Sequence, residues 1–156
     1  LVGAQVAFYP QFPGYLRVGY RELVVSGRQR EQIALAIMWR VARAFATGTA
    51  HPRIEDVAAS TGLPVVALIP VAARLEAAGL LTRSERDELL PNREPGQIRL
   101  HDILDAVREP LEGDLVARGR FPAPVSGLMQ RVQGGIQAAL GEETLADAAR
   151  EEPPAA

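Results

Sequence analysis

The sequence predicts a mainly α-helical fold: a winged helix-turn-helix with a small two-stranded wing and a C-terminal helical extension. The central observation is residues 54–81, IEDVAASTGLPVVALIPVAARLEAAGLL. Here two apolar-periodic segments flank a turn at Thr61-Gly62, and the second segment ends at Gly79. Two short apolar runs then enclose the polar residues 84–87, which is the pattern of a β-hairpin. A helix, a tight turn, a second helix and a hairpin, in this order, together indicate the winged form of the motif.

The composition is that of one compact domain with appendages. The chain has 156 residues, of which 47% are hydrophobic and 23% charged, and its formal net charge of −2 gives no overall positive signal for nucleic acid. Every basic residue is Arg, so no Lys is available for catalysis. The absence of Cys excludes disulfides, thiolate catalysis and cysteine-ligated clusters. The sequence has no run of about 18 apolar residues that would span a membrane.

We expect four segments along the chain. Residues 1–25 form an N-terminal or juxtamembrane arm, residues 26–110 the winged-helix domain, residues 111–150 the C-terminal helical extension, and residues 151–156 a disordered tail. The boundary between the domain and its extension is indicated by the Gly and Pro residues of the stretch 111–124.

The first helix of the domain is expected from Arg28 to Ala46, with Ser26 or Gly27 as its N-cap. Apolar residues recur at steps of four along it and predict the face that packs against the core: Ile33, Ile37, Val41 and Phe45. Gly48 then ends the helix.

The two helices of the helix-turn-helix are predicted next. The first covers residues 54–60, and acidic residues in its first turn suit a helix N-terminus. The second has Pro64 at its first helical position and continues to Ala78. Pro70 lies inside it and removes a backbone hydrogen bond, so we expect either a kink after Leu68 or a later start of the helix.

The remaining elements are short strands and helices. We expect strands over 80–83 and 88–91 joined by the turn 84–87, a helix over 98–109, a helix over 125–140 and a short helix from Thr144. The helix over 98–109 has an apolar face made of Leu100, Ile103, Leu104 and Val107.

From residue 28 to residue 149 this order of elements resembles the IscR-type family of winged-helix repressors. The matching stretches are DVAASTGLP, RLEAAGLL, IRLHDILDAV and TLADAA, of which the last two are the more specific. The resemblance implies a transcriptional regulator that binds DNA as a homodimer, with residues 125–140 as the dimerisation helix. Sensor members of that family hold an iron–sulfur cluster on three Cys beside this helix. Residues 126–137 contain no Cys, so no cofactor is expected.

The N-terminus allows two interpretations. The apolar residues 1–8 are followed by helix-breaking Pro and Gly and then by interleaved Tyr and Arg, the order found where a helix leaves a bilayer on its cytoplasmic side. The arginines that would then lie at the anionic membrane surface are Arg17, Arg21, Arg28 and Arg30. In the second interpretation this segment is an arm folded on the domain.

A second resemblance favours the membrane interpretation. The stretch VGAQVAFYPQFPGYLRVGYRE is similar to the junction after the last transmembrane helix in BrkB/YihY-type (ribonuclease-BN-like) inner-membrane proteins. The resemblance implies a winged-helix extension on the cytoplasmic face of the bacterial inner membrane, whereas a free-standing regulator would be cytoplasmic.

The outward face of the helix that follows Pro64 decides between protein and DNA as its partner. Its outward residues are all apolar: Val65, Val66, Ile69, Pro70 and Ala73. Such a face is typical of a protein-interaction patch, covered by the N-terminal arm, by the helix over 125–140, by a second copy or by a membrane domain. The candidates for DNA contact are Arg74, Arg83 and Arg86, and residues 51–110 carry seven Arg against ten acids. The sequence therefore disfavours DNA as a partner.

No catalytic chemistry is predicted. The two histidines, His51 and His101, fall in different elements, and no nucleophile, metal-ligand set or phosphate-binding loop accompanies them. We therefore expect no enzyme activity, no cofactor and no metal. The preferred hypothesis is a non-catalytic cytoplasmic interaction or regulatory domain of an inner-membrane protein. The alternative is a cysteine-free DNA-binding regulator of the IscR type.

Overall fold

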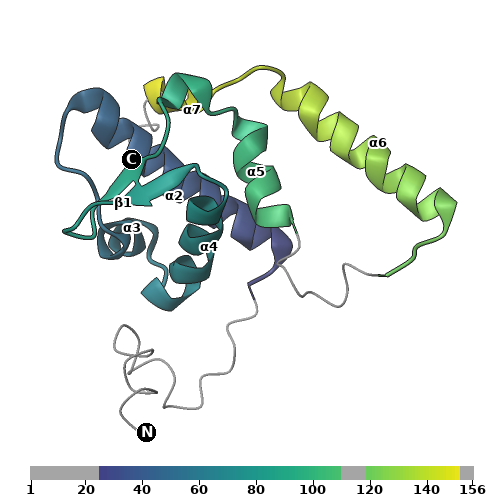
Figure 1. The fold of residues 1–156 in the computed structure, drawn as a ribbon, viewed down its shortest axis with the longest axis horizontal. Coiled ribbons are helices and arrows are strands. Elements are labelled where there is room, and N and C mark those ends of the chain that lie inside the picture. The colour runs from purple at the N-terminus through teal and green to yellow at the C-terminus, as the bar shows by residue number, and fades with distance from the viewer. Residues whose placement is uncertain (1–24, 110–118, 152–156) are drawn as a thin grey trace, which may run out of the picture.

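A computed structural model describes residues 25–109 and 119–151 of the chain (Figure 1). These residues form seven helices, counting one short 3-10 helix, and one two-stranded sheet. The prediction of a mainly helical winged helix-turn-helix is confirmed. Most of the predicted arm and tail, residues 1–24 and 152–156, and the connector 110–118 lie outside the described residues.

Helix α2 (Gly27–Thr47) forms the long support of the domain. Ser26 caps it, because its hydroxyl accepts a hydrogen bond from the Gln29 amide while the Ser26 amide donates to the Gln29 side chain. At the other end Gly48 takes a left-handed conformation with φ 62°. The buried stripe of α2 consists of Ile33, Ala34, Ile37, Met38, Val41, Ala42 and Ala44.

The prediction that Phe45 belongs to this stripe is wrong, because the side chain is 50% exposed. A step of four residues exceeds one helical turn by about 40°, so three such steps from Ile33 rotate a residue by about 120° around the helix. The core-facing position in the last turn is therefore Ala44 rather than Phe45.

Helix α3 (Ile54–Thr61) and helix α4 (Val65–Ala77) form the helix-turn-helix. Gly62 makes the turn with φ 69°, a conformation that suits Gly because it has no Cβ. Pro64 is the N-cap of α4 rather than its first helical residue. Helix α4 thus begins one residue later than predicted, at Val65, and still includes Pro70.

The wing is an antiparallel pair of strands, β1 (Leu81–Arg83) and β2 (Leu89–Pro91), with Thr82 opposite Leu90. Its turn is closed by the Ser84 hydroxyl, which accepts hydrogen bonds from the amides of Arg86 and Glu88. The Leu89 amide donates to the carbonyl of Pro52 at 2.7 Å, so the wing is tied to the segment that leads into α3.

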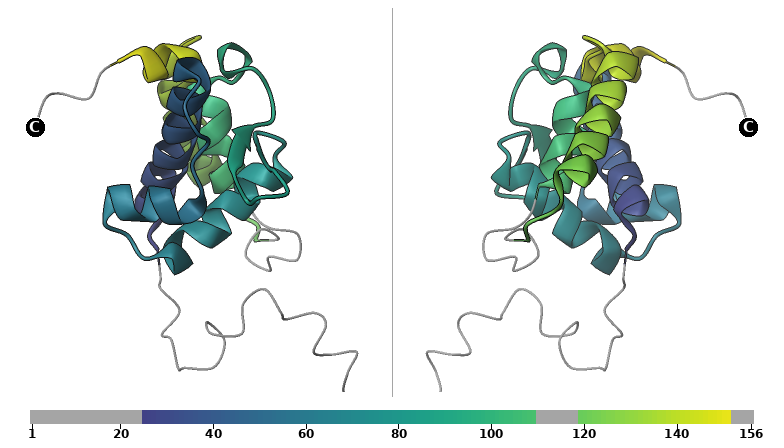
Figure 2. Two further views of the ribbon diagram at one scale, coloured as in Figure 1. Left: turned by 90° about the vertical axis from the view of Figure 1, so that its left-hand side faces the viewer. Right: turned by 90° about the vertical axis from the view of Figure 1, so that its right-hand side faces the viewer.

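After the wing come η1 (Pro95–Gln97), α5 (Leu100–Arg108), α6 (Ala123–Leu140) and α7 (Leu145–Arg150). In both figures α3 and α4 lie at one end of the molecule and α7 at the other, while α6 forms an outer layer beside α5 (Figures 1 and 2). Helix α6 contains no buried residue. Helix α7 packs on α2 and buries Leu145 and Ala149 in the same core as the winged helix.

Candidate nucleic-acid interface

Helix α4 has one face in the core and one face in solvent. The core face is made of Ala67, Leu68, Val71, Ala72 and Leu75. On the other face Pro70 and Ala73 are exposed, and Val65, Val66 and Ile69 are partly exposed. The five residues predicted as a protein-interaction patch therefore do share the solvent side of α4, although Val65 also packs against the core.

Arg74, a predicted DNA contact, holds α4 to the end of α5. Its Nη1 donates to the carbonyl oxygen of Val107 at 3.0 Å and to that of Glu109 at 2.8 Å. The last carbonyls of a helix have no partner within the helix, so the guanidinium caps the C-terminus of α5. Arg30, a predicted membrane-surface residue, approaches the same Val107 carbonyl from α2 at 3.5 Å.

Arg83, the second predicted DNA contact, joins the wing to α4. Its Nε donates to the carboxylate of Glu76 on α4, and its Nη1 lies 3.9 Å from Asp87 in the turn of the wing. Both members of the Arg83–Glu76 pair are about one-third exposed. This contact fixes the orientation of the wing relative to α4 and uses part of the positive charge of Arg83.

Arg86 differs from the other two arginines. Its side chain is exposed at the tip of the wing, and no ion pair involves it within the described parts of the chain. Sequence reasoning missed Arg53, which is exposed at the N-cap of α3, next to the helix-turn-helix. The signal that could have found it is its position directly before the first turn of α3, where a helix-turn-helix crosses the phosphate backbone.

Acidic residues limit the positive charge on this side. Asp56 accepts a hydrogen bond from the Arg53 amide and caps α3, and Glu55 is exposed beside it. Glu85 and Asp87 are exposed on the wing next to Arg86. A polyanion at this surface would therefore find few unopposed positive charges.

Helix α6 exposes an apolar stripe. Its exposed fractions are 42% for Val125, 51% for Leu128, 62% for Met129 and 54% for Val132. These residues recur every three or four positions and so lie on one face of the helix. An exposed apolar stripe of this length is typical of a protein–protein interface.

The polar face of α6 is held to α5. Gln133 donates to the carboxylate of Asp105 at 2.8 Å and accepts from Nη1 of Arg108 at 3.2 Å. Arg108 also pairs with Glu31 of α2 at 2.6 Å. These contacts hold α6 beside α5, while the four residues of the apolar stripe remain exposed.

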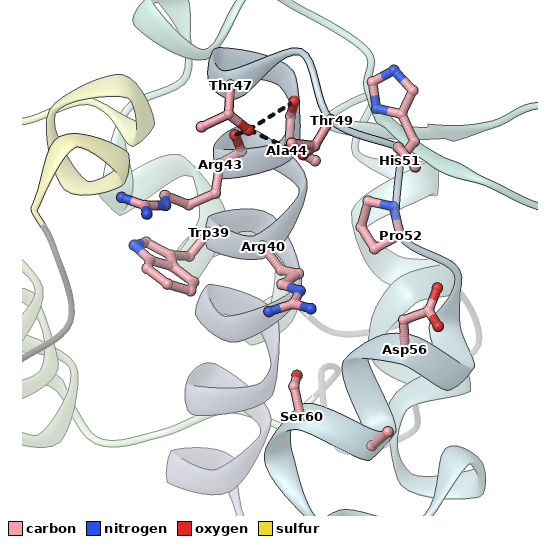
Figure 3. Close-up of a pocket in the computed structure, with 12 residues that line it drawn as sticks. Trp39, Arg40, Arg43, Ala44, Thr47, Thr49, His51, Pro52, Asp56 and Ser60 are labelled. Carbon is pink, nitrogen blue, oxygen red and sulfur yellow. Dashed lines mark hydrogen bonds between the residues drawn. The ribbon is translucent and has the colours of Figure 1, made fainter. Parts of the chain in front are cut away.

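A separate groove of about 880 Å³ is lined by α2, the segment 49–52 and α3 (Figure 3). Arg40 points toward the α3 side, where Asp56 and Ser60 lie, while Trp39 and Arg43 point toward α7. The Trp39 Nε1 donates to Ala148, so this part of the wall belongs to the packing of α7. No group of three metal-binding side chains occurs among the residues that the structure describes.

The predicted membrane-surface arginines are only partly placed. Arg17 and Arg21 lie outside the described residues, Arg28 is exposed at the start of α2, and Arg30 is directed to the end of α5. Within the described ranges, no helix is both long enough and apolar enough to cross a membrane.

Comparison with solved structures finds the same fold in bacterial regulators. CymR, the global cysteine regulator of B. subtilis, is similar with a TM-score of 0.60 and 22% identity, over 80% of this chain and 95% of that chain. The oxidised form of Staphylococcus aureus CymR is similar with a TM-score of 0.61 and 18% identity, over 83% of this chain and 98% of that chain. T. potens IscR is similar with a TM-score of 0.57 and 23% identity, over 85% of this chain and 94% of that chain. The chain matches no protein-family model and no curated protein sequence.

These similarities support the resemblance to IscR-type winged helices and contradict the expectation that DNA is disfavoured as a partner. A further solved structure, described as a candidate DNA-binding protein, shares the fold with a TM-score of 0.53 and 19% identity over 74% of this chain and 97% of that chain. The expectation counted only polar and basic side chains as DNA contacts, whereas backbone amides and apolar side chains also contact DNA. No comparison supports the resemblance to BrkB/YihY-type membrane proteins, which rests mainly on residues 1–24.

Proposed function

We propose that this chain is a DNA-binding transcriptional regulator that contacts the major groove with α4 and the adjacent backbone with its wing. The observation that carries the proposal is the position of α4. It is the second helix of the helix-turn-helix, it turns a face to solvent, and Arg83 fixes the wing beside it. In a helix-turn-helix the second helix is the one that enters the groove.

The proposed phosphate contacts are Arg53 and Arg86. Both side chains are exposed. Arg53 is the N-cap of α3 and Arg86 lies in the wing, and both of these elements contact α4. Arg74 and Arg83 act differently, because their guanidinium groups hold α4 to α5 and to the wing. Their role is to position the interface rather than to contact phosphate.

We propose that the regulator is a homodimer formed through α6. Two copies related by a twofold axis would bury the stripe of Val125, Leu128, Met129 and Val132 against the same stripe of the partner. The two α4 helices would then read two half-sites about one turn of DNA apart, so the operator is expected to be palindromic.

Protein binding through the outward face of α4 is a second candidate function. It is favoured by the wholly apolar character of Val65, Val66, Ile69, Pro70 and Ala73. Affinity for DNA separates it from the first proposal, because a surface used only for protein contact would bind no duplex.

The experiment is to measure binding of the full chain to a pool of random duplexes by fluorescence anisotropy at several salt concentrations. We expect salt-dependent binding and selection of a palindromic site. Arg53→Ala and Arg86→Ala should weaken binding to all sequences alike, and each should lower the slope of log K against log salt by about one per protomer. Arg150→Ala is the matched control, since Arg150 is exposed on α7, at the end of the molecule away from α4. The absence of binding to any duplex would overturn the proposal.

A further inference from the structure

We infer that α4 recognises thymine methyl groups, so that the chain selects T·A base pairs through apolar contacts rather than through hydrogen bonds. This inference rests on the proposed function and specifies which chemical group of the DNA α4 reads. It follows from the apolar side chains on the outward face of α4 and from the absence of polar side chains there.

No side chain from Leu63 to Ala73 can donate or accept a hydrogen bond. This stretch includes the turn before α4 and the N-terminal half of the helix, which is the part that contacts base edges in a helix-turn-helix. The first polar residue of α4 is Arg74, which caps α5, and the next is Glu76, which pairs with Arg83 of the wing. The polar side chains of α4 are therefore directed to the protein.

The apolar side chains are available on the outside. Leu63 is 39% exposed, Pro70 and Ala73 are exposed, and Val66 and Ile69 are partly exposed. Their branched and ring carbons form the surface that α4 would bring to the floor of the groove.

The major groove offers one apolar group for such a surface. Its base edges carry hydrogen-bond donors and acceptors, except for the C5-methyl group of thymine. An apolar side chain pressed against the other edges removes water from polar atoms and replaces none of their hydrogen bonds, which is unfavourable. Against a thymine methyl the same side chain gains buried apolar area.

The charge around α4 agrees with this mode of recognition. Arg53 and Arg86 are complementary to phosphate, but Glu55 and Glu85 are exposed next to them. With few phosphate contacts, a larger share of the affinity must come from the base edges. Recognition through methyl groups is therefore expected to have a large effect on affinity.

The test replaces single thymines by deoxyuridine in the best duplex selected by the full chain. This substitution removes the methyl group and leaves the base pair intact. We expect a loss of about fourfold in affinity for each contacted methyl group. In the complementary arm, exchange of a contacted T·A pair for C·G should weaken binding, and 5-methylcytosine at that position should restore part of the loss.

Variants of α4 link the effect to named side chains. In Val66→Ser and Ile69→Ser the penalty for deoxyuridine should shrink at the positions that each residue contacts, which is the sign of direct coupling in a double-mutant cycle. Phe45→Ser is the matched control, because Phe45 is an exposed apolar residue of α2 outside the helix-turn-helix. In this variant the loss of affinity caused by deoxyuridine should be the same as in the unaltered chain. Thermal unfolding of each variant checks that the fold is retained.

The outcomes separate this inference from the proposed function. Specific binding that is insensitive to every deoxyuridine substitution would overturn methyl recognition and leave DNA binding in place. The same conclusion would follow if Val66→Ser and Ile69→Ser left DNA affinity unchanged, as expected if the patch contacts a protein. Failure to bind any duplex would overturn both.

Discussion

The guanidinium group of Arg74 on α4 donates a 3.0 Å hydrogen bond to the carbonyl of Val107 at the end of α5. The same nitrogen donates to Glu109 at 2.8 Å. The first polar residue of α4 is thus a structural tie between two helices. The consequences of this and three other features can be measured.

Loss of the Arg74 tie should destabilise the domain. Arg74→Ala removes two hydrogen bonds from a charged donor to carbonyls at a helix end, so we expect a loss of about 2 kcal/mol in the free energy of unfolding. Urea denaturation followed by circular dichroism measures it. Arg86→Ala is the control, because Arg86 is exposed on the wing, and it should leave the midpoint unchanged. Equal stability of the two variants would contradict the role assigned to Arg74.

The turn of the helix-turn-helix should require Gly. Gly62 has φ 69°, and a Cβ added there would meet no atom within 4 Å, so backbone strain alone opposes a side chain. Gly62→Ala should cost about 1 to 2 kcal/mol. Gly27→Ala has equal space and no left-handed φ, and it should be neutral or stabilise by up to about 1 kcal/mol. Thermal unfolding of both variants tests the prediction, and a stable Gly62→Ala protein would argue against this turn.

Dimerisation should depend on the apolar stripe of α6. Met129→Glu places a charge in the proposed interface, and we expect it to weaken the dimer by about 3 kcal/mol, which is more than a hundredfold in Kd. Gln130→Glu adds the same charge at the adjacent exposed position of α6 and should have little effect. Sedimentation equilibrium distinguishes the two variants. A monomer at all concentrations of the unaltered chain would exclude this interface.

The stability that the N-terminal cap of α7 contributes should depend on pH in the acid range. The Thr144 amide and hydroxyl donate to Asp147, and these hydrogen bonds lower the pKa of Asp147 below its ordinary value of 3.8. Because the folded-state pKa is lowered, ionised Asp147 stabilises the fold at any pH above the unfolded-state pKa. This contribution is lost as the pH falls through the folded-state pKa. The stability of the unaltered chain should therefore exceed that of Asp147→Asn at pH 7 and approach it near pH 3. A difference that does not change with pH would contradict this cause.

Much of the fold could be predicted from local signals. Gly48, Gly62 and Gly79 mark helix ends because each adopts a left-handed conformation, and the strands of the wing follow from two short apolar runs. Steps of four did not place Phe45 correctly, because each step adds about 40° of rotation around the helix. The sequence alone does not show which turn of the helix faces the core.

The candidate site was harder to predict. The partners of Arg74 are 33 and 35 residues away, so no local pattern indicates that this Arg is used inside the protein. The five outward residues predicted on α4 are exposed or partly exposed, but which partner covers them is not encoded in any local pattern. Similarity to solved regulators contradicted the expectation that DNA is disfavoured as a partner.

Trp39, the only tryptophan of the chain, donates its indole N–H to the carbonyl of Ala148 in α7, and the guanidinium of Arg43 lies 5.5 Å from its ring. Indole emission is sensitive to hydrogen bonding and to a nearby cation, so the chain carries an intrinsic fluorescent reporter at the contact between α2 and α7. Undocking of α7 should change the emission maximum without any label, while α3 and α4 are still folded. The separation of the C-terminal helix from the winged helix can thus be followed optically in real time.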